Sequence, residues 1–290
     1  MKFGDAYGPN KFGLSFELFP PKTEAGEAAL FRHVEKLVAF RPSFVTCTYG
    51  AGGSTRDKTL SIISQVHERF DMPVASHLTC VGAKVDELRE YLREAAERGI
   101  ENIVALRGDP PQGETEFKAV SGGFSYAKQL VELIRAEFPQ LGIAVAGYPE
   151  THQEATSPAD DLEHLKRKVD AGADVIITQL FYDNADFFRF RDACDKLNVG
   201  VPIVPGLLPV INFGQIKRIT GLCGAGLPDD FTQALAACGE DAAAQIEVGI
   251  EFASRQVQEL IDQDVPGVHF YVLNKSEATA RVLEAVRRPG

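Results

Sequence analysis

The sequence predicts an α/β fold, specifically a (β/α)8 (TIM) barrel, formed by a single domain over residues 1–290. Apolar runs of strand length alternate with longer amphipathic runs. Joints such as "ERGIENIVALRG" and "DAGADVIITQL" place a glycine between the two, as is typical of repeated βαβ units. About eight such units follow one another, which is the number that a (β/α)8 barrel requires. A doubly wound open sheet is the alternative, although it would usually contain fewer strands.

The expected elements follow from this alternation in chain order. Strands are expected at 13–19, 43–49, 73–79, 102–107, 142–148, 174–180, 202–207 and 268–273. Helices are expected at 23–40, 54–70, 83–98, 124–138, 158–171 and 184–197. The stretch between the seventh and eighth strands is overlong, so extra helical material is expected there, near 229–235 and 241–264. No linker or low-complexity run divides the chain.

Composition restricts the class of protein. A chain of 290 residues that is 44% hydrophobic can bury a sizeable core. Its net charge of −11 disfavours non-specific binding to nucleic acid or to anionic membranes. No apolar run reaches the roughly 18 residues of a membrane span, and the N-terminus lacks the apolar segment of a secretion signal. The five scattered cysteines form no C-x-x-C pair, which is typical of reduced thiols. We therefore expect a cytoplasmic protein that binds neither nucleic acid nor membranes.

Polar residues gather where the expected strands end. These ends read "ELFPP", "TYGA", "HLTC", "RGDP", "YPETH", "QLFYD", "PG" and "NK", whereas the opposite ends are mostly plain. The active site of such a barrel forms at the carboxyl ends of its strands. The asymmetry therefore predicts a site built from many loops. Polar residues that simply mark strand ends would instead appear at both ends.

The segment "GLSFELFPPK" at 13–22 places a carboxylate in an apolar strand. Leu14, Phe16 and Leu18 share one face of the strand, and Glu17 lies on the other. Because the apolar face suits contact with the ring of helices, Glu17 is expected to point inward at the carboxyl end of the barrel. A partly desolvated carboxyl there can act as a general acid. The alternative is a solvated glutamate at a strand end.

Other kinds of site have weaker support. His77, His152 and His269 lie on separate elements without the spacing of metal ligands, so no metal is expected. No lysine occupies an interior strand position, as Schiff-base chemistry would require. The "GAGGS" run matches neither a Walker motif nor G-x-G-x-x-G.

Eight blocks in order resemble the strand-end motifs of methylenetetrahydrofolate reductases. They are "SFELFPPKT", "TYGAGGSTRDKT", "SHLTC", "ALRGDPP", "AGYPETH", "LKRKVDAGADVIITQLFYD", "VPGLLPVINF" and "HFYVLNK", from about residue 13 to residue 275. The resemblance implies a bacterial-type catalytic barrel without the C-terminal regulatory domain of eukaryotic members. It implies non-covalent FAD, a homo-oligomer, and the reduction of 5,10-methylenetetrahydrofolate to 5-methyltetrahydrofolate by NADH or NADPH. The two substrates would use one site in turn, in a ping-pong cycle that serves one-carbon metabolism and methionine biosynthesis.

The resemblance also implies roles for individual residues. Glu17 would protonate folate N10 and open the imidazolidine ring, and Asp109 would favour the resulting cation. Gln179, Phe213 and Lys275 would join Glu17 and Asp109 in binding the substrates. The FAD contacts implied are Thr48, Tyr49, Ala51, His77, Arg107, Gly108, Asp109, Tyr126, Ala127, Tyr148, His152, Asp161, Arg167 and Lys168.

The assignments of four of these residues stay open, namely Arg167, Lys168, Phe213 and Lys275. Arg167 and Lys168 belong to a basic run that would offset the FAD pyrophosphate together with Arg107, or that would be a solvated helix face. Phe213 would pack on the substrates, or would stabilise a helix start. Lys275 stands where the family usually has arginine, and a lysine keeps the charge but loses the bidentate fork.

Two other functions stay open on the sequence alone. Another flavin-dependent barrel, such as an imino-acid dehydrogenase, would use the same kind of fold without a special role for Glu17. A folate- or flavin-binding module without chemistry is the non-enzymatic alternative. The joint presence of Glu17, Asp109 and Gln179 argues against the non-enzymatic alternative.

Overall fold

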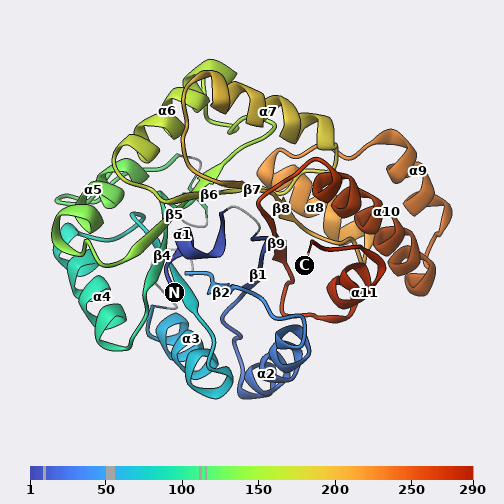
Figure 1. Ribbon diagram of the computed structural model, residues 1–290, viewed down its shortest axis with the longest axis horizontal. Coiled ribbons are helices and arrows are strands. Elements are labelled where there is room, and N and C mark those ends of the chain that lie inside the picture. The colour runs from blue at the N-terminus through green and yellow to red at the C-terminus, as the bar shows by residue number, and fades with distance from the viewer. Residues whose placement is uncertain (9–10, 50–55, 111–112, 115, 290) are drawn as a thin grey trace.

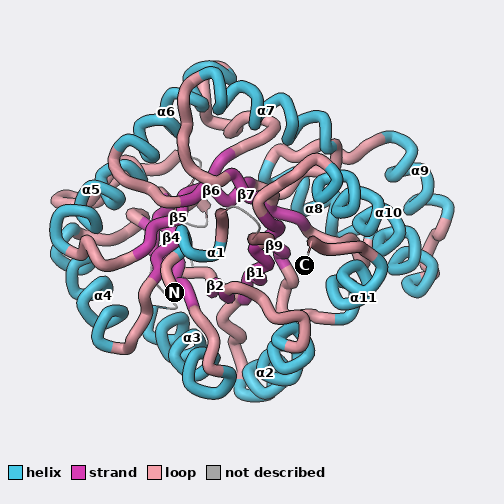
Figure 2. Tube along the Cα trace, in the orientation of Figure 1, coloured by secondary structure: helices cyan, strands magenta, loops and turns pink. Residues whose placement is uncertain are grey.

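The computed structural model describes residues 1–8, 11–49, 56–110, 113–114 and 116–289, and within these its strands form one parallel sheet. Figure 2 shows the strands as a central ring surrounded by helices. In chain order the strands are β1 (Gly13–Leu18), β2 (Phe44–Cys47), β3 (Val74–Thr79), β4 (Asn102–Leu106), β5 (Gly142–Gly147), β6 (Val175–Thr178), β7 (Ile203–Val204), β8 (Gly206–Leu207) and β9 (Gly267–Tyr271).

The sheet nearly closes on itself at Pro205. Its strand order runs β7-β6-β5-β4-β3-β2-β1-β9-β8, and the two outermost strands, β7 and β8, are separated in the chain by Pro205 alone. Both pieces lie within the single seventh strand expected at 202–207. Proline has no N–H to donate to a strand ladder, so the strand divides there. The (β/α)8 barrel is confirmed, with its seventh strand in two short pieces.

The helices that follow the strands form the outer ring, as Figure 1 shows. They are α2 (Glu24–Val38), α3 (Arg56–Phe70), α4 (Val85–Glu97), α5 (Ala127–Glu137), α6 (Pro158–Asp170), α7 (Asn184–Lys196) and, at the end, α11 (Glu277–Ala285). Each of the six expected helices is present, and α6 and α7 begin at the expected residues and end one residue earlier than expected. Side-chain caps account for three of the starts, with Thr23, Ser157 and Asp183 accepting from backbone N–H groups.

The extra helical material before the last strand is also present. It consists of α8 (Phe213–Cys223), α9 (Asp229–Ala237) and α10 (Ala242–Asp262). Phe231 and Leu235 of this region form an apolar cluster with Leu180, Tyr182 and Leu208, which follow β6 and β8. Figure 1 shows the group on one side of the barrel, next to β8 and β9.

Strand alternation separates two apolar layers. Leu14, Phe16 and Leu18 of β1 are buried in the large cluster shared with the helices. The inward residues at the amino end of the barrel form a smaller cluster with the N-terminal segment, in which a short helix α1 (Phe3–Ala6) lies across the ring (Figure 1). Phe3 has no exposed surface, and its ring meets Phe44 edge-on at 4.8 Å. The N-terminal segment therefore plugs this end of the barrel, which the sequence did not reveal.

Two composition-based expectations can be compared with the structure. None of the helices among the described residues is long and apolar enough to cross a membrane. All five cysteines are free thiols, and three of them are buried.

Candidate active site

Glu17 lies inside the carboxyl end of the barrel, as strand alternation predicted. Its register partners are Thr46 on β2 and Tyr271 on β9, and the residue is only 7% exposed. Leu18 and Phe16 point the other way, into the core beneath the helices. The solvated strand-end alternative is therefore wrong for Glu17.

Two histidines flank the Glu17 carboxylate. His77 on β3 places Nε2 at 3.3 Å from Glu17 Oε2, and His269 on β9 places Nε2 at 3.8 Å from the same oxygen. Burial lowers the pKa of His77. The charge of Glu17 raises this pKa in part, and the neighbouring His269 lowers it further. His77 is therefore a neutral imidazole near pH 7. A neutral imidazole beside a carboxyl group can share one proton with it in a hydrogen bond.

His269 is in turn held by a hydroxyl group. Ser15 Oγ and His269 Nδ1 are 2.8 Å apart, and both residues are almost fully buried. Two residues along β9, the Tyr271 hydroxyl donates to the carbonyl of Thr178 on β6 at 2.6 Å. Burial, followed by the nearby Glu17, raises the pKa of Tyr271 well above its ordinary value. Tyr271 is therefore a neutral hydrogen-bond donor that links β9 to β6 across the barrel interior beside Glu17.

A second group of side chains, mostly cationic, lies at the ends of β4 and β5. Arg107 holds Glu154 with both arms of its guanidinium, Nη1 to Oε2 at 2.6 Å and Nη2 to Oε1 at 2.8 Å. Lys168 donates from Nζ to the carbonyl of Ala146 at 2.6 Å. Desolvation lowers the pKa of Lys168 to about 8, partly opposed by Asp161 and reinforced by Arg107. This lysine is thus a cation that an added anion would stabilise.

The basic run on α6 divides between the interior and the surface. Lys168 points toward the strand ends, whereas Arg167 is exposed and pairs with Glu163 at 2.9 Å. Lys166 pairs with Asp170 on the same helix. Arg167 therefore lies on the solvated helix face and Lys168 does not, and contact of either residue with the FAD pyrophosphate stays a prediction.

Comparisons with known proteins identify the family of this chain. The family model described as methylenetetrahydrofolate reductase matches residues 2–287. The chain belongs to the methylenetetrahydrofolate reductase family.

Relatives in this family fall into two length classes. The 5,10-methylenetetrahydrofolate reductase of Escherichia coli is 40% identical over 97% of this chain and 93% of its own length. The methylenetetrahydrofolate reductase (NADH) 1 of Zea mays is 39% identical over 97% of this chain and 49% of its own length. The chain therefore spans about half the length of the plant relatives it matches.

Solved structures confirm the barrel. A Clostridium thermocellum protein superposes with a TM-score of 0.62 at 17% identity and covers 94% of both chains. A 2,3-dimethylmalate lyase superposes with a TM-score of 0.53 at 10% identity, over 91% of this chain and 75% of that one. At such identities the likeness concerns the fold alone.

The other residues implied by the resemblance to methylenetetrahydrofolate reductases lie as follows. Asp109 is exposed just after β4. The pKa of Tyr148 is raised mainly by the burial of Tyr148 and, to a smaller extent, by the negative charge of Asp109. Tyr148 meets His152 edge-on at 4.6 Å, and the backbone N–H of His152 donates to Asp161. These groups lie near Arg107, which also affects the pKa values of Tyr148 and His152.

The backbone at Gly108 requires a glycine. Its φ is +87°, and a Cβ there would lie 2.7 Å from Val81 and 3.0 Å from Thr79. The hydroxyl oxygen of Thr79 is buried without a hydrogen-bond partner among the described residues. A polar ligand group at this place would satisfy that hydroxyl.

The remaining cofactor assignments lie on the adjoining loops. Tyr126 is 59% exposed, directly precedes Ala127 at the start of α5, and stacks against His164. The carbonyl of Thr48 accepts from Thr59, and Tyr49 meets Tyr91 edge-on. Ala51 lies outside the described residues.

Three of the assigned substrate residues follow the carboxyl ends of strands β6, β8 and β9. Gln179 follows β6, Phe213 is the first residue of α8, and Lys275 follows β9. Phe213 is part-buried, and Lys217 Nζ lies 5.0 Å from the centre of its ring. The helix-start alternative thus matches its position, without excluding contact with a ligand.

Sequence reasoning missed the partners of the main site residues. Strand alternation places Ser15 on the same face as Glu17, but its contact with His269 depends on the pairing of β1 with β9, which joins residues 254 positions apart in the chain. Glu154 gave no signal as the partner of Arg107. Among the described residues, no group of three or more His, Cys, Asp or Glu could hold a metal ion.

Proposed function

We propose that this chain is an FAD-dependent reductase that converts 5,10-methylenetetrahydrofolate to 5-methyltetrahydrofolate with NADH or NADPH. In this proposal residues 1–290 act as one FAD-binding catalytic domain. Family membership supports the reaction, and so does the Escherichia coli relative, which is named for this activity and matches along nearly its whole length. The Clostridium thermocellum neighbour binds two copies of 5-methyl-5,6,7,8-tetrahydrofolic acid, which supports a folate as the ligand in this proposal.

The observation that carries the proposal is the buried Glu17 beside His77. Opening the five-membered ring of the folate requires a proton on N10 as the N10–CH2 bond breaks. Glu17 Oε2 lies 3.3 Å from a neutral imidazole, so the pair can hold a proton inside the barrel and release it to N10. The methylene carbon then remains double-bonded to N5 as a cation, and addition of a hydride makes it the methyl group of the product.

The residues at the ends of β3, β4 and β5 fit a flavin dinucleotide. Arg107 and Lys168 supply two cations for a pyrophosphate. The Thr79 hydroxyl, which has no hydrogen-bond partner among the described residues, and the close backbone at Gly108 mark a place where a polar ring edge can approach. When bound, FAD supplies the redox relay, taking a hydride from the nicotinamide cofactor and passing it to the folate in a ping-pong order.

The remaining residues orient the substrates in this proposal. Asp109 places a negative charge where the folate cation forms, which lowers the energy of that cation. Gln179 offers both a donor and an acceptor to the pterin and to the nicotinamide. Phe213 covers the substrate, and Lys275 pairs with the carboxylate tail of the folate.

Two measurements on the purified protein test this function. The first is a visible spectrum after incubation with FAD, in which we expect a bound flavin that NADH or NADPH bleaches. The second is reoxidation of the bleached protein by methylenetetrahydrofolate under anaerobic conditions. A protein that takes up no FAD would contradict every flavin-dependent function. Bleaching without folate-dependent reoxidation would instead favour another flavin-dependent dehydrogenase.

A further inference from the structure

The loop after β9 begins with a tight turn in a left-handed conformation. Leu273 and Asn274 have positive φ angles of 47° and 56°, and the N–H of Lys275 donates to the carbonyl of Val272 at 2.8 Å. Turns with two positive φ angles usually contain glycine, asparagine or aspartate, and leucine rarely adopts this conformation. Such a turn persists only where the surrounding structure holds it in place.

The side chain of Asn274 holds this turn against the end of β1. The N–H of Phe19 donates to Asn274 Oδ1 at 2.8 Å, and Asn274 Nδ2 donates to the carbonyl of Phe19 at 2.7 Å. The last register pair of the two strands is Glu17 with Tyr271, so the amide continues the pairing of β1 with β9 after the β9 backbone has turned away. An asparagine can do so because its amide, like a peptide group, offers both a donor and an acceptor.

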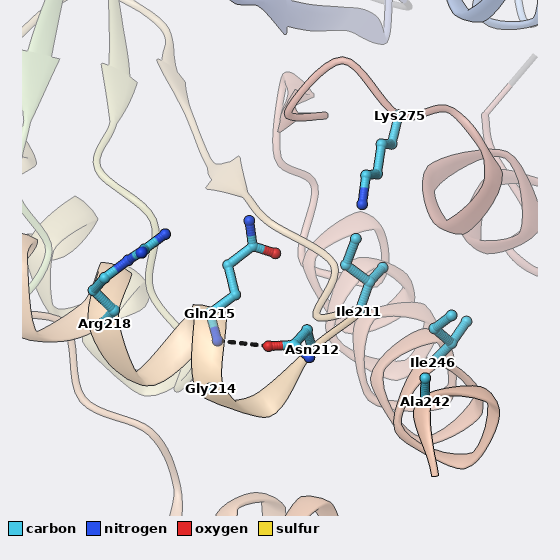
Figure 3. A pocket seen from close by; sticks show the side chains of 8 residues that line it. All are labelled: Ile211, Asn212, Gly214, Gln215, Arg218, Ala242, Ile246 and Lys275. Atoms are coloured by element: carbon cyan, nitrogen blue, oxygen red, sulfur yellow. Dashed lines mark hydrogen bonds between the residues drawn. The ribbon is translucent and has the colours of Figure 1, made fainter. Parts of the chain in front are cut away.

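The same turn determines where the Lys275 side chain begins. Lys275 lines a pocket of about 560 Å³ together with Asn212, Gln215 and Arg218 from the first turns of α8, and Figure 3 shows it extending from the loop toward α8. Among the described residues no ion pair holds its ammonium group. The direction of this side chain therefore depends on the backbone of the turn rather than on a charged partner.

A second contact holds the loop on the other side of Lys275. Ser276 has no exposed surface, its Oγ lies 3.0 Å from His33 Nδ1 on α2, and its N–H donates to the same nitrogen at 3.3 Å. Lys275 itself is exposed. The backbone is thus fixed on both sides of one exposed cation, and of these two contacts only the Asn274 amide reaches the strand that carries Glu17.

We propose that Asn274 is a positioning residue, which sets the separation between Glu17 and Lys275 so that one folate can meet both. The inference rests on the proposed function, in which Glu17 protonates N10 and Lys275 pairs with the carboxylate tail of the same molecule. Phe19 lies two residues beyond Glu17, and Asn274 directly precedes Lys275, so the amide joins the two places through short stretches of chain. Two groups that bind one ligand gain affinity when their spacing is fixed in advance, because less conformational entropy is lost on binding.

The Asn274→Gly variant tests this role. It removes the amide, while glycine adopts a positive φ without strain. We expect the KM for methylenetetrahydrofolate to rise about 3- to 10-fold, as when a charge-assisted contact near the surface is lost. The kcat and the rate at which NADH bleaches the flavin should stay near their wild-type values, because Glu17 keeps its strand partners Thr46 and Tyr271.

A double-mutant cycle shows whether Asn274 acts through Lys275. Lys275→Met alone should raise the same KM by a similar factor. Adding Asn274→Gly to Lys275→Met should raise it by no more than about twofold further, because no cation is left to be placed. A general loosening of the loop would instead multiply the two effects.

Asn102→Ala is the matched control. Asn102 also joins two segments through backbone groups, because its Oδ1 accepts from the N–H of Phe3 at 2.8 Å and its Nδ2 donates to the carbonyl of Met1 at 2.9 Å. It lies at the amino end of the barrel, opposite the candidate active site. This variant should unfold at a lower urea concentration and should keep the wild-type KM for the folate.

Four results would overturn the inference. They are a wild-type KM in Asn274→Gly, a wild-type KM in Lys275→Met, effects of these two substitutions that multiply in the double variant, and an equal rise of KM in Asn102→Ala. Failure of the proposed function is a separate result, because it would be seen in the wild-type protein. There, NADH would bleach the flavin and methylenetetrahydrofolate would not reoxidise it.

Discussion

His77 Nε2 and Glu17 Oε2 lie 3.3 Å apart inside the barrel, with both side chains only 9% exposed. Because burial lowers the pKa of His77, the pair carries at most one negative charge near neutral pH and is not a simple ion pair. A carboxyl group in this setting can exchange a proton with a substrate while water is largely excluded.

The Glu17→Gln variant should separate the two half-reactions. We expect the nicotinamide cofactor to bleach the flavin at nearly the wild-type rate, because that hydride transfer needs no general acid. Reoxidation by methylenetetrahydrofolate should slow by roughly 10²- to 10⁴-fold. Stopped-flow absorbance measures both rates on one sample. If both half-reactions slowed equally, Glu17 would serve the structure of the site rather than proton transfer.

The affinity for FAD should fall as the pH rises through about 8. Desolvation lowers the pKa of Lys168 from its ordinary 10.5 to about 8, so the apoprotein loses this cation above pH 8. A pyrophosphate beside Lys168 would favour the protonated form, and FAD binding should therefore take up a proton in this range. Fluorescence titration of FAD between pH 6.5 and 9.5 measures the effect.

The Lys168→Met variant is the control for that titration. It should bind FAD more weakly at pH 7 and should lack the pH dependence near 8. If the affinity for FAD varied with pH in the same way in the wild type and in the Lys168→Met variant, Lys168 would not contact the cofactor.

The same lowered pKa of Lys168 also affects folding. The unfolded chain binds more protons at Lys168 between about pH 8 and 10.5, so this group should make the free energy of unfolding increase with pH in that window.

The Glu154→Gln variant should bind FAD more tightly. Glu154 occupies both arms of Arg107, and a pyrophosphate would compete with it for the same guanidinium. Because the carboxylate is 47% exposed, the gain should be modest, up to about 1 kcal/mol or roughly fivefold in Kd. Glu247→Gln is the matched control, since Glu247 forms the same kind of bidentate pair with Arg281 on another face. Weaker binding in Glu154→Gln would show that Glu154 holds Arg107 in place for the cofactor.

The Phe3→Ala variant should destabilise the whole barrel. Phe3 is fully buried in the amino end of the ring, against Phe44, and removing a buried aromatic ring typically costs about 3–5 kcal/mol. Urea unfolding followed by circular dichroism measures the change. Leu222→Ala is the control, because Leu222 is 76% exposed and its truncation should cost less than about 0.5 kcal/mol. A change below about 1 kcal/mol in Phe3→Ala would mean that the N-terminal segment separates from the barrel without unfolding it.

The order of strands and helices could be predicted because it depends on local patterns. Alternation along β1 identified the inward side of Glu17, and the long insertion before β9 was visible from its length and helical period. The division of the seventh strand follows from one local cause, Pro205, which the continuous apolar pattern concealed.

The partners of the site residues could not be predicted in the same way. Ser15 and His269 meet because β1 pairs with β9 and closes the ring, and nothing local to either strand specifies that register. Likewise, Lys166, Arg167 and Lys168 look alike in the sequence, and only the rotation of α6 against the barrel turns Lys168 inward.

The sequence by itself therefore determined the barrel, its family and the end at which polar groups gather, because periodicity and ordered motifs are properties of the chain read in one direction. Only the tertiary structure decided which of those groups meet. Closing the sheet places Glu17 between His77 and His269, and the α8 insertion places Arg218 across a pocket from Lys275. The physical reason is that proton exchange and charge recognition depend on separations of a few ångströms between atoms far apart in the chain.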